Sequence, residues 1–411
     1  MSVENRDILS AELVEDSHGY WAELRANDPV HWDESQKAWL LTRYDDVVDG
    51  FLDPRLSSDR IRPLLDKLPP ERRERLAPML EIMGDWLSVV DPPVHTRLRK
   101  LANGAFRGQR IAHMTEWINE LVNSLIDEFI ASGSTDFVDG IAGPLPATVL
   151  ARLMGAPAAD GPLFRKWSDE LALVAFSAGD AAAPDRYARA YAGVGEMQNY
   201  LRALIDDRRK NPDDDMISAL LMPAEDGDRL DDDELLAMCT LILFAGHETT
   251  TNLLCNTLVM LEREPEAREA LLADPGLTTT AVEEVLRYEG PVKIIVRWIA
   301  EDHERGGKML HAGDRAYLVL HAANRDENVF ENPNTFDIRR PTQPPHIAFG
   351  RGAHSCLGAQ LSRLEARLAL PIVLERLPGL RITEPVQWKP LAGARAVNAL
   401  HVTHTARATA S

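Results

Sequence analysis

One cysteine of this chain stands where a metal ligand is expected. Cys356 lies in the glycine-rich stretch F-G-R-G-A-H-S-C-L-G, residues Phe349 to Gly358, directly before an apolar segment with the spacing of one helix face. At a helix N-terminus, the dipole and the free backbone N–H groups favour a thiolate, which is the form that binds metal. Gly350 and Gly352 allow positive φ and close backbone approach, as a loop under a flat cofactor requires. The alternative is a buried structural cysteine.

A second group of residues suits proton transfer. The segment A-G-H-E-T-T, from Ala245 to Thr250, interrupts an otherwise apolar helical stretch. Gly246 costs about 1 kcal/mol relative to alanine inside a helix, and Glu248 next to Thr249 is costly to bury unless both groups are satisfied. We interpret the segment as a local groove that admits a small ligand, to which the acid and the alcohol relay protons. The alternative is a helix kink whose polar face meets solvent.

Two charged pairs have the spacing of one helical turn. His95 and Arg99 present cationic side chains on one helix face, which suits an anionic group. The alternative for this pair is a solvated basic helix. Glu284 and Arg287 place a carboxylate and a guanidinium at positions i and i+3, close enough to pair. Taken alone, the second pair is an ordinary surface salt bridge.

The segments that carry these residues are mostly predicted helices. Helical patterns cover residues 111–130, 163–176, 186–209 and 280–288. A longer one begins with a capping box formed by Asp231 and Glu234 and ends near Pro265. Strand patterns appear near both ends of the chain, at residues 30–43 as a hairpin, 292–299 and 316–320. Pro371 is expected to kink or end the last helix.

Length and composition limit the classes of protein that fit. No linker, low-complexity tract or repeat divides the 411 residues, so we expect a single domain over residues 1–411. A net charge of −19 argues against nucleic acid as a partner. Three cysteines without a C-x-x-C pair argue against a disulfide framework or a structural zinc site. A polar N-terminus and the lack of a long apolar run predict a cytoplasmic protein with no membrane partner.

Taken in their order along the chain, these four motifs resemble those of the cytochrome P450 family, over roughly residues 20 to 403. The ten-residue cysteine loop resembles the family's haem-ligand loop and is the most specific part of the match. The resemblance implies a mainly α fold with small β-sheets, in which haem b lies between the long helix and the cysteine loop. The cofactor-binding residues that it implies on these two elements are Ala245, Gly246, Phe349, Gly350, Cys356 and Gly358, with Cys356 as the metal ligand.

The resemblance also assigns roles to charged and polar groups. Four side chains are implied to bind the haem propionates: His95, Arg99, Arg297 and His354. Three others are implied to form a buried group that supports the cysteine loop: Glu284, Arg287 and Arg340. Thr249 steadies bound oxygen and Glu248 feeds the proton chain, so these two are the implied catalytic residues. His247 stands at a position that varies in the family and receives no role.

The implied reaction is monooxygenation, in which one atom of O2 enters a small organic substrate, by hydroxylation or epoxidation, and the other leaves as water. No nucleotide-binding glycine fingerprint follows a strand, so electrons are expected from separate proteins. The resemblance to soluble bacterial members implies that these are a ferredoxin and an NAD(P)H-dependent ferredoxin reductase. One alternative is a haem-thiolate enzyme of the same fold that uses peroxide or performs a non-oxygenating reaction. The other is a non-catalytic haem-binding or sensor protein. The Glu248–Thr249 pair argues against the first, and the lack of room for an output domain argues against the second.

Two basic segments suggest where the electron donor docks. Residues 92–115 and 338–364 contain no acidic residue but several basic ones. In the family's fold both lie on the cysteine side of the haem. We therefore expect an acidic ferredoxin to dock there, steered by charges that include Lys100 and Arg107.

One lysine suggests a property of the substrate. If side chains alternate along the strand at 292–299, Lys293 shares a face with Arg297, which is the haem side if Arg297 binds a propionate. The family resemblance also places this segment along the substrate pocket. Burial would lower the pKa of Lys293 unless an anion compensates, and a carboxylate of the substrate could be that anion. The alternatives are a bulge that breaks the alternation, or a lysine that reaches solvent along its stem.

Overall fold

The computed structural model describes residues 3–106, 108–175 and 186–405, and most of its elements are helices. The predicted fold class, mainly α with small β-sheets, is therefore correct. None of the described helices is long and apolar enough to cross a membrane. The helices are α1 (Ala11–Glu15), α2 (His18–Asn27), α3 (Tyr44–Leu52), α4 (Arg62–Lys67), α5 (Pro70–Gly84), α6 (Val94–Ala105), α7 (Gly108–His113), α8 (Thr115–Ser132), α9 (Pro144–Leu153), α10 (Gly161–Ala175), α11 (Arg186–Lys210), α12 (Met216–Leu221), α13 (Asp232–Arg263), α14 (Pro265–Ala273), α15 (Thr278–Glu289), α16 (Leu320–Ala323) and α17 (Ala359–Arg376).

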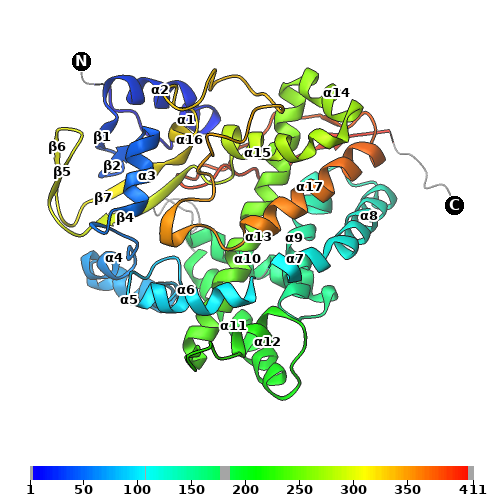
Figure 1. Ribbon diagram of the computed structural model, residues 1–411, viewed down its shortest axis with the longest axis horizontal. Helices are drawn as coiled ribbons and strands as arrows, with labels where there is room; N and C mark the ends of the chain where they lie inside the picture. The colour runs from blue at the N-terminus through cyan, green and yellow to red at the C-terminus, as the bar shows by residue number, and fades with distance from the viewer. Residues whose placement is uncertain (1–2, 107, 176–185, 406–411) are drawn as a thin grey trace.

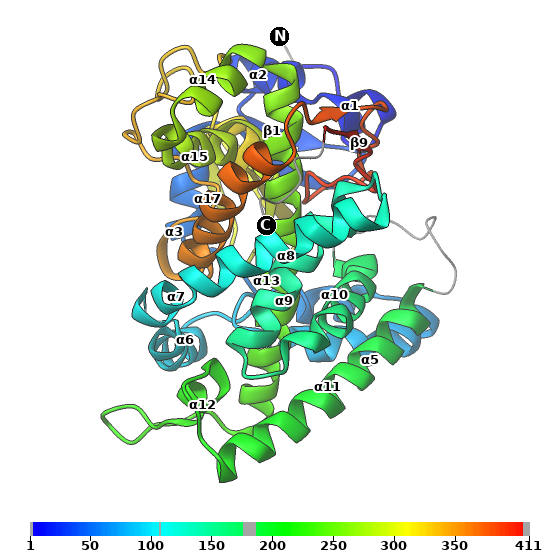
Figure 2. The ribbon, with the colours of Figure 1, turned by 90° about the vertical axis from the view of Figure 1, so that its right-hand side faces the viewer.

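The longest helix, α13, passes through the middle of the molecule (Figures 1 and 2). It begins at the predicted capping box. There the Glu234 N–H donates to the Asp231 carboxylate at 2.8 Å, and the Asp231 N–H donates to the Glu234 carboxylate at 3.0 Å. It ends at Arg263, directly before the helix that starts with Pro265. Its 32 residues span about 48 Å. Because α9, α10, α15 and α17 all contact it, most of its side chains are buried.

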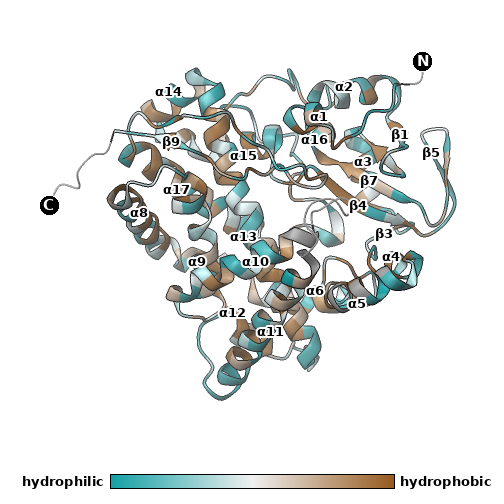
Figure 3. Ribbon diagram, turned by 180° about the vertical axis from the view of Figure 1, so that it is seen from behind, coloured by the Kyte–Doolittle hydropathy of each residue, from teal (hydrophilic) through white to brown (hydrophobic). Residues whose placement is uncertain are grey.

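The main sheet lies beside the helical part and has the strand order β1-β2-β7-β4-β3 (Figure 1). Its strands are β1 (Val30–Asp33), β2 (Ala38–Leu41), β3 (Leu56–Ser57), β4 (Ile294–Ile299) and β7 (Arg315–Val319). β1 and β2 form the predicted hairpin. β4 pairs with β7 and places Arg297 opposite Ala316. Figure 3 shows β4 and β7 mostly in hydrophobic colours, which agrees with their burial. The small sheets pair β5 (His303–Arg305) with β6 (Lys308–Leu310) and β8 (Arg381–Ile382) with β9 (Val402–Thr403).

One of the two outcomes predicted for Pro371, the end of the helix, does not occur. α17 runs from Ala359 to Arg376 with Pro371 inside it, so the proline does not end the helix. An interior proline costs about 3 kcal/mol, because it removes one N–H donor and crowds the preceding turn. Leu370 and Val373 on either side are buried in the main core, and this packing offsets the local cost.

Candidate functional site

The backbone of the cysteine loop has the conformation that its glycines predict. Gly350 and Gly352 have φ angles of 70° and 69°, in the left-handed region that favours glycine. The Cys356 N–H donates to the Phe349 carbonyl at 2.9 Å and closes the loop just before α17. The Cys356 side chain is exposed, so its sulfur is accessible to a ligand.

The pKa of the Cys356 thiol differs from the prediction. Burial of the sulfur among protein atoms raises the pKa, although the side chain keeps an accessible surface. The backbone N–H groups of Gly358 and Ala359 at the start of α17 lower it, as do Arg99 and Arg363. Because burial outweighs these groups, the pKa lies above its ordinary value, and the helix N-terminus alone does not produce a thiolate. A bound metal cation would supply the missing stabilisation.

The middle of α13 presents an accessible face among buried residues. Ala245 is exposed and Thr249, one turn later, is half-buried, whereas Phe244, His247, Glu248 and Thr250 are buried. The Thr249 hydroxyl donates to the Ala245 carbonyl at 2.8 Å, which keeps it on this face. α13 also meets the segment that follows the cysteine loop, since the Thr250 hydroxyl donates to Ser362 of α17 at 3.2 Å. The accessible face of α13 and the cysteine loop can therefore line one site.

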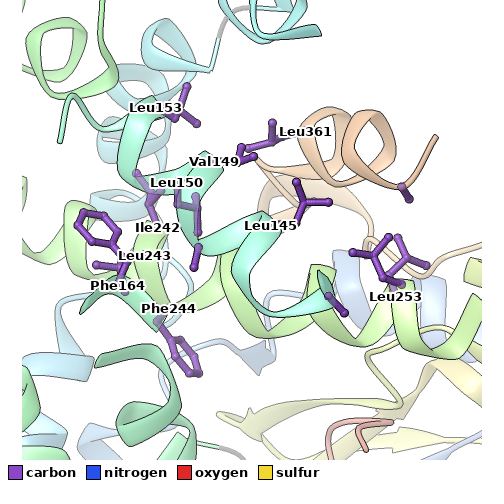
Figure 4. Close-up of a cluster of buried hydrophobic side chains, with 14 of the residues drawn as sticks. Leu145, Val149, Leu150, Leu153, Phe164, Ile242, Leu243, Phe244, Leu253 and Leu361 are labelled. Atoms are coloured by element: carbon purple, nitrogen blue, oxygen red, sulfur yellow. The ribbon is translucent and has the colours of Figure 1, made fainter. Parts of the chain in front are cut away.

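Gly246 also has a structural role that the sequence did not predict. A Cβ on Gly246 would lie 2.9 Å from a methyl carbon of Leu150, too close for unstrained packing. Leu150 belongs to α9, and Figure 4 shows α9 packed along α13 at this point. The glycine therefore lets two helices approach closely, while Ala245, Gly246 and Thr249 all keep accessible surface, and the contact of Gly246 with a cofactor stays a prediction.

Glu248 and Thr249 are neighbours in the chain but do not share a hydrogen bond. The Glu248 carboxylate accepts from Asn252 Nδ2 and from Lys389 Nζ, each at 3.4 Å. Successive side chains on an α-helix point about 100° apart, so the acid and the alcohol face different neighbours. A proton passing between them therefore needs an intervening water or a side-chain rotation. Lys389 was not predicted as part of this site, because it lies 141 residues further along the chain.

The predicted propionate-binding groups gather around the cysteine loop. The rings of His95, on α6, and His354, in the loop, have centroids 3.9 Å apart. His95 is fully buried, and neither of its ring nitrogens has a hydrogen-bond partner among the described residues. Burial and then the neighbouring His95 lower the pKa of His354 to about 3. Arg99 reaches the loop by donating to the Ser355 carbonyl at 2.7 Å.

One buried and one half-buried arginine adjoin these histidines. Arg297 on β4 is 3% exposed, donates to the Val296 carbonyl at 3.2 Å and lies over the ring of Phe51. Arg60, which was not predicted, donates to the Ser88 carbonyl at 3.3 Å. Burial lowers the pKa of each guanidinium to about 10, and in Arg297 the charge of Arg60 contributes. Arg60 stands in a loop, where no periodic pattern in the sequence indicates its direction.

Positive charges that are withdrawn from water and not paired with an acid favour a bound anion. The group consists of three guanidinium groups, with Arg297 buried and Arg60 and Arg99 half-buried. It also contains His95 and His354, whose lowered pKa values leave them as neutral rings that can donate a hydrogen bond. None of the five forms an ion pair with an acid in the part of the chain that the structure describes, although the charge of Asp91 acts on His95 and Arg297. The two carboxylates of haem are such an anion, and an accessible cysteine sulfur is a ligand that suits haem iron. The residues present therefore fit haem.

The predicted supporting group is buried and fully paired. Arg287 donates twice to the Glu284 carboxylate, at 2.8 Å each, and Arg340 Nε donates to it at 3.1 Å. The Asp337 N–H adds a further hydrogen bond at 2.9 Å. The side chains of Glu284 and Arg287 are 1% and 2% exposed. This group ties α15 to the segment that leads into the cysteine loop.

A second connection, formed by Glu283, was not predicted. Its carboxylate accepts from His346 Nε2 at 3.0 Å and from Arg363 Nε at 2.6 Å. The Arg363 guanidinium also lies 4.4 Å from the centroid of the Phe349 ring in the loop. Glu283 therefore ties α15 to residues on both sides of Cys356.

Lys293 lies one residue before β4. The alternation of side chains along a strand therefore does not determine which way it points. Val292 and Ile295 pack in the same apolar cluster, although strict alternation would put them on opposite faces. Lys293 is buried, and burial together with Arg395 lowers its pKa to about 8, while Glu289 raises it. The burial of Lys293 and its lowered pKa agree with the prediction, but the direction of its ammonium group toward a substrate stays a prediction.

Comparison with known proteins identifies the family. Residues 70–378 match the family model described as cytochrome P450. Cytochrome P450 107B1 of Saccharopolyspora erythraea is 39% identical over 93% of this chain and 94% of its own length. The monooxygenase PikC of Streptomyces venezuelae is 37% identical over 96% and 92%. The vitamin D(3) 25-hydroxylase of Pseudonocardia autotrophica is 38% identical over 92% and 91%.

Solved structures agree with the sequence relatives. P450BioI, in complex with hexadec-9Z-enoic acid ligated acyl carrier protein, superposes with a TM-score of 0.86 at 32% identity, over 96% of this chain and 100% of that one. CalO2 superposes with a TM-score of 0.88 at 29% identity, over 98% and 100%. The chain therefore belongs to the cytochrome P450 family and is a haem-dependent monooxygenase.

Proposed function

We propose that this protein holds haem b between α13 and the cysteine loop, with the Cys356 thiolate as the metal ligand, and oxygenates a small organic substrate by hydroxylation or epoxidation. The observation that carries the proposal is the group of arginines and histidines, none ion-paired with an acid in the described chain, around the loop that bears an accessible cysteine. Bound haem supplies the activation of O2. The chain supplies binding, orientation and protons.

Each part of the chain has a proposed task. The propionates are bound by His95, Arg99, Arg297 and His354, to which we add Arg60. The surface against the haem is formed by Ala245, Phe349, Gly350 and Gly358, with Gly246 allowing α9 to pack behind it. The Thr249 hydroxyl orients and protonates the bound oxygen substrate, and Glu248 moves protons toward it. The largest of three hydrophobic clusters in the described chain draws on residues from Val14 to Val402, which supports a single domain over residues 1–411.

The experiment that tests the ligand is spectroscopic. The reduced protein with carbon monoxide is expected to show the red-shifted Soret band of thiolate-ligated haem. Cys356→Ser should abolish this band, whereas Cys239→Ser and Cys255→Ser should keep it, because both of these cysteines are buried and burial raises their thiol pKa. A band that survives in Cys356→Ser would contradict the proposal.

We further propose that a ferredoxin and its NAD(P)H-dependent reductase supply the electrons and that the ferredoxin docks on the basic side of the cysteine loop. The proposal includes a cytoplasmic location, which suits three unpaired cysteines. Several of the predicted docking cations are already paired with acids: Arg97 with Asp228, Lys100 with Asp226 and Arg110 with Asp214. These acids weaken the positive surface, so steering by charge is expected to be moderate. Arg107 lies outside the described residues.

A further inference from the structure

Three polar side chains meet behind the proposed oxygen site. Asp169 of α10 and His247 and Glu248 of α13 each direct a carboxylate oxygen or ring nitrogen into one cluster, in which these atoms all lie within 4.8 Å of one another. None of them belongs to the cation group or to the loop of Cys356. One water can bridge two oxygens at such a separation.

His247 is the least satisfied member of the cluster. The residue is 1% exposed, and neither ring nitrogen forms a hydrogen bond of normal geometry among the described residues, although the Gly143 backbone lies close enough to raise the pKa of the ring. Its Nδ1 lies 3.9 Å from a carboxylate oxygen of Asp169, too far for a direct hydrogen bond. A buried, unpaired polar group costs about 1–3 kcal/mol, so a helix core retains one only where it is compensated, for example by an ordered water.

Exposure changes in steps across the cluster. The Asp169 side chain is 49% exposed, whereas those of His247 and Glu248 are 2% and 5% exposed. Thr249 follows Glu248 directly in the chain and lies on the accessible face of α13. The cluster therefore connects a carboxylate that solvent reaches with the hydroxyl at the oxygen site.

The charges that face Asp169 set its proton affinity. Burial raises the pKa of Asp169 first, and the nearby Glu248 carboxylate raises it further, to about 6. Arg165 on the same helix and Lys389 act in the opposite direction, and Asp139 adds to the increase. Two carboxylates that share a site resist simultaneous ionisation, so the position of Asp169 beside Glu248 by itself also predicts a raised pKa. A carboxylate of this kind exchanges protons near neutral pH.

We propose that Asp169 takes up protons from solvent and passes them to Glu248 along a path lined by His247. The proposal rests on the monooxygenase function above, whose overall reaction consumes O2, two electrons from the donor proteins and two protons, and yields the oxygenated product and one water. Each proton moves from solvent to the Asp169 carboxylate, then through bridging water to Glu248, and on to the Thr249 hydroxyl. Asp169 and His247 touch neither substrate nor cofactor, so they act as relay and positioning residues.

The same three side chains have the chemistry of a metal site, but the charges favour protons. The Lys389 ammonium lies 3.4 Å from Glu248 Oε1 and would repel a divalent cation. Treatment with EDTA is therefore expected to leave all the measurements below unchanged. An EDTA-dependent change would assign the cluster to a cation and overturn the proposal.

The test compares Asp169→Asn with Glu170→Gln in the haem-loaded protein. Glu170 is the adjacent carboxylate on α10 but faces α11, where it contacts Gly193, so it is a matched control. In Asp169→Asn, coupling of NAD(P)H consumption to product is expected to fall by about tenfold, less than the roughly hundredfold loss typical when a general acid–base group itself is removed. The pH dependence of coupling near pH 6 should disappear, and Asp169→Glu should restore it. His247→Leu, which removes both ring nitrogens and keeps an apolar side chain, should also lower coupling.

A second readout does not depend on activity. Infrared difference spectra of the resting protein, without electron donor, should show a carboxyl band that titrates near pH 6 in wild type and Glu170→Gln but not in Asp169→Asn. Wild-type coupling in Asp169→Asn, or the absence of that band in wild type, would overturn the proposal. If Asp169→Asn stays coupled while Thr249→Ala loses coupling, the inference fails and the proposed function stands.

Discussion

Replacing Glu283 by glutamine is expected to loosen the attachment of the cysteine loop to α15. Burial alone would raise the pKa of Glu283, but hydrogen bonds from His346 and Arg363 outweigh it and lower the pKa from 4.5 to about 2. At about 1.4 kcal/mol for each pH unit, this difference corresponds to about 3 kcal/mol of folding free energy at neutral pH. Because Arg363 packs on the Phe349 ring of the loop, the variant should also release haem faster.

The lowered pKa of Glu283 also predicts how the stability difference between wild type and Glu283→Gln changes with pH. The folded-state pKa lies below the unfolded one, so the stabilisation is fully present above pH 4.5 and is lost as the pH falls toward 2. At pH 3.5, about 2 kcal/mol of the original 3 should remain. The difference in stability between wild type and Glu283→Gln should therefore shrink by about one third over this range.

Urea unfolding at pH 7 and at pH 3.5, followed by circular dichroism and haem absorbance, measures the difference in the free energy of unfolding. Glu269→Gln is the control, because Glu269 is exposed on α14, and its effect should stay within about 0.5 kcal/mol. Two results would refute the reasoning. One is a Glu283→Gln variant as stable as the control at pH 7, and the other is a stability difference that grows as the pH falls.

Three other predictions concern the reaction and its partners. Thr249→Ala should keep haem and substrate binding but divert electrons to hydrogen peroxide, whereas Thr249→Ser should keep NAD(P)H consumption coupled to product. Hydrogen peroxide is assayed together with NAD(P)H consumption. Unchanged coupling in Thr249→Ala would remove the hydroxyl from the mechanism. Lys100→Glu should slow reduction by ferredoxin about 2- to 5-fold and reduce the salt dependence of that rate. Lys210→Glu, at the exposed end of α11, should leave the rate unchanged. Stopped-flow measurements test both variants. Lys293→Met should abolish any preference for a carboxylic acid over its ester in binding titrations, and equal affinities already in wild type would reject a carboxylate substrate.

The features that the sequence predicted well depend on local spacing. The long α13 helix follows from its capping box and the proline after it, and both are read within a few residues. The cysteine loop follows from glycines that need positive φ and from a cysteine before a helix. The Glu284–Arg287 contact follows from the i, i+3 geometry of any helix. In each case the relevant atoms are held together by the backbone of a single segment.

The features that it missed depend on contacts between distant segments. Glu248 meets Lys389 and Asp169, and Glu283 meets His346 and Arg363, only because separate helices and loops pack there. The direction of Lys293 cannot be taken from strand alternation, because β4 begins at Ile294, two residues later than predicted.

Burial is the other quantity that only the tertiary structure decided. The helix N-terminus does lower the pKa of Cys356, but the protein packed around the sulfur raises it more. The same holds for Arg297, whose guanidinium calls for an anion only because the fold removes it from water and pairs it with no acid in the described chain, with Asp91 acting on it only through its charge. Spacing along the chain sets which face a side chain takes, whereas its solvation depends on everything that packs against that face.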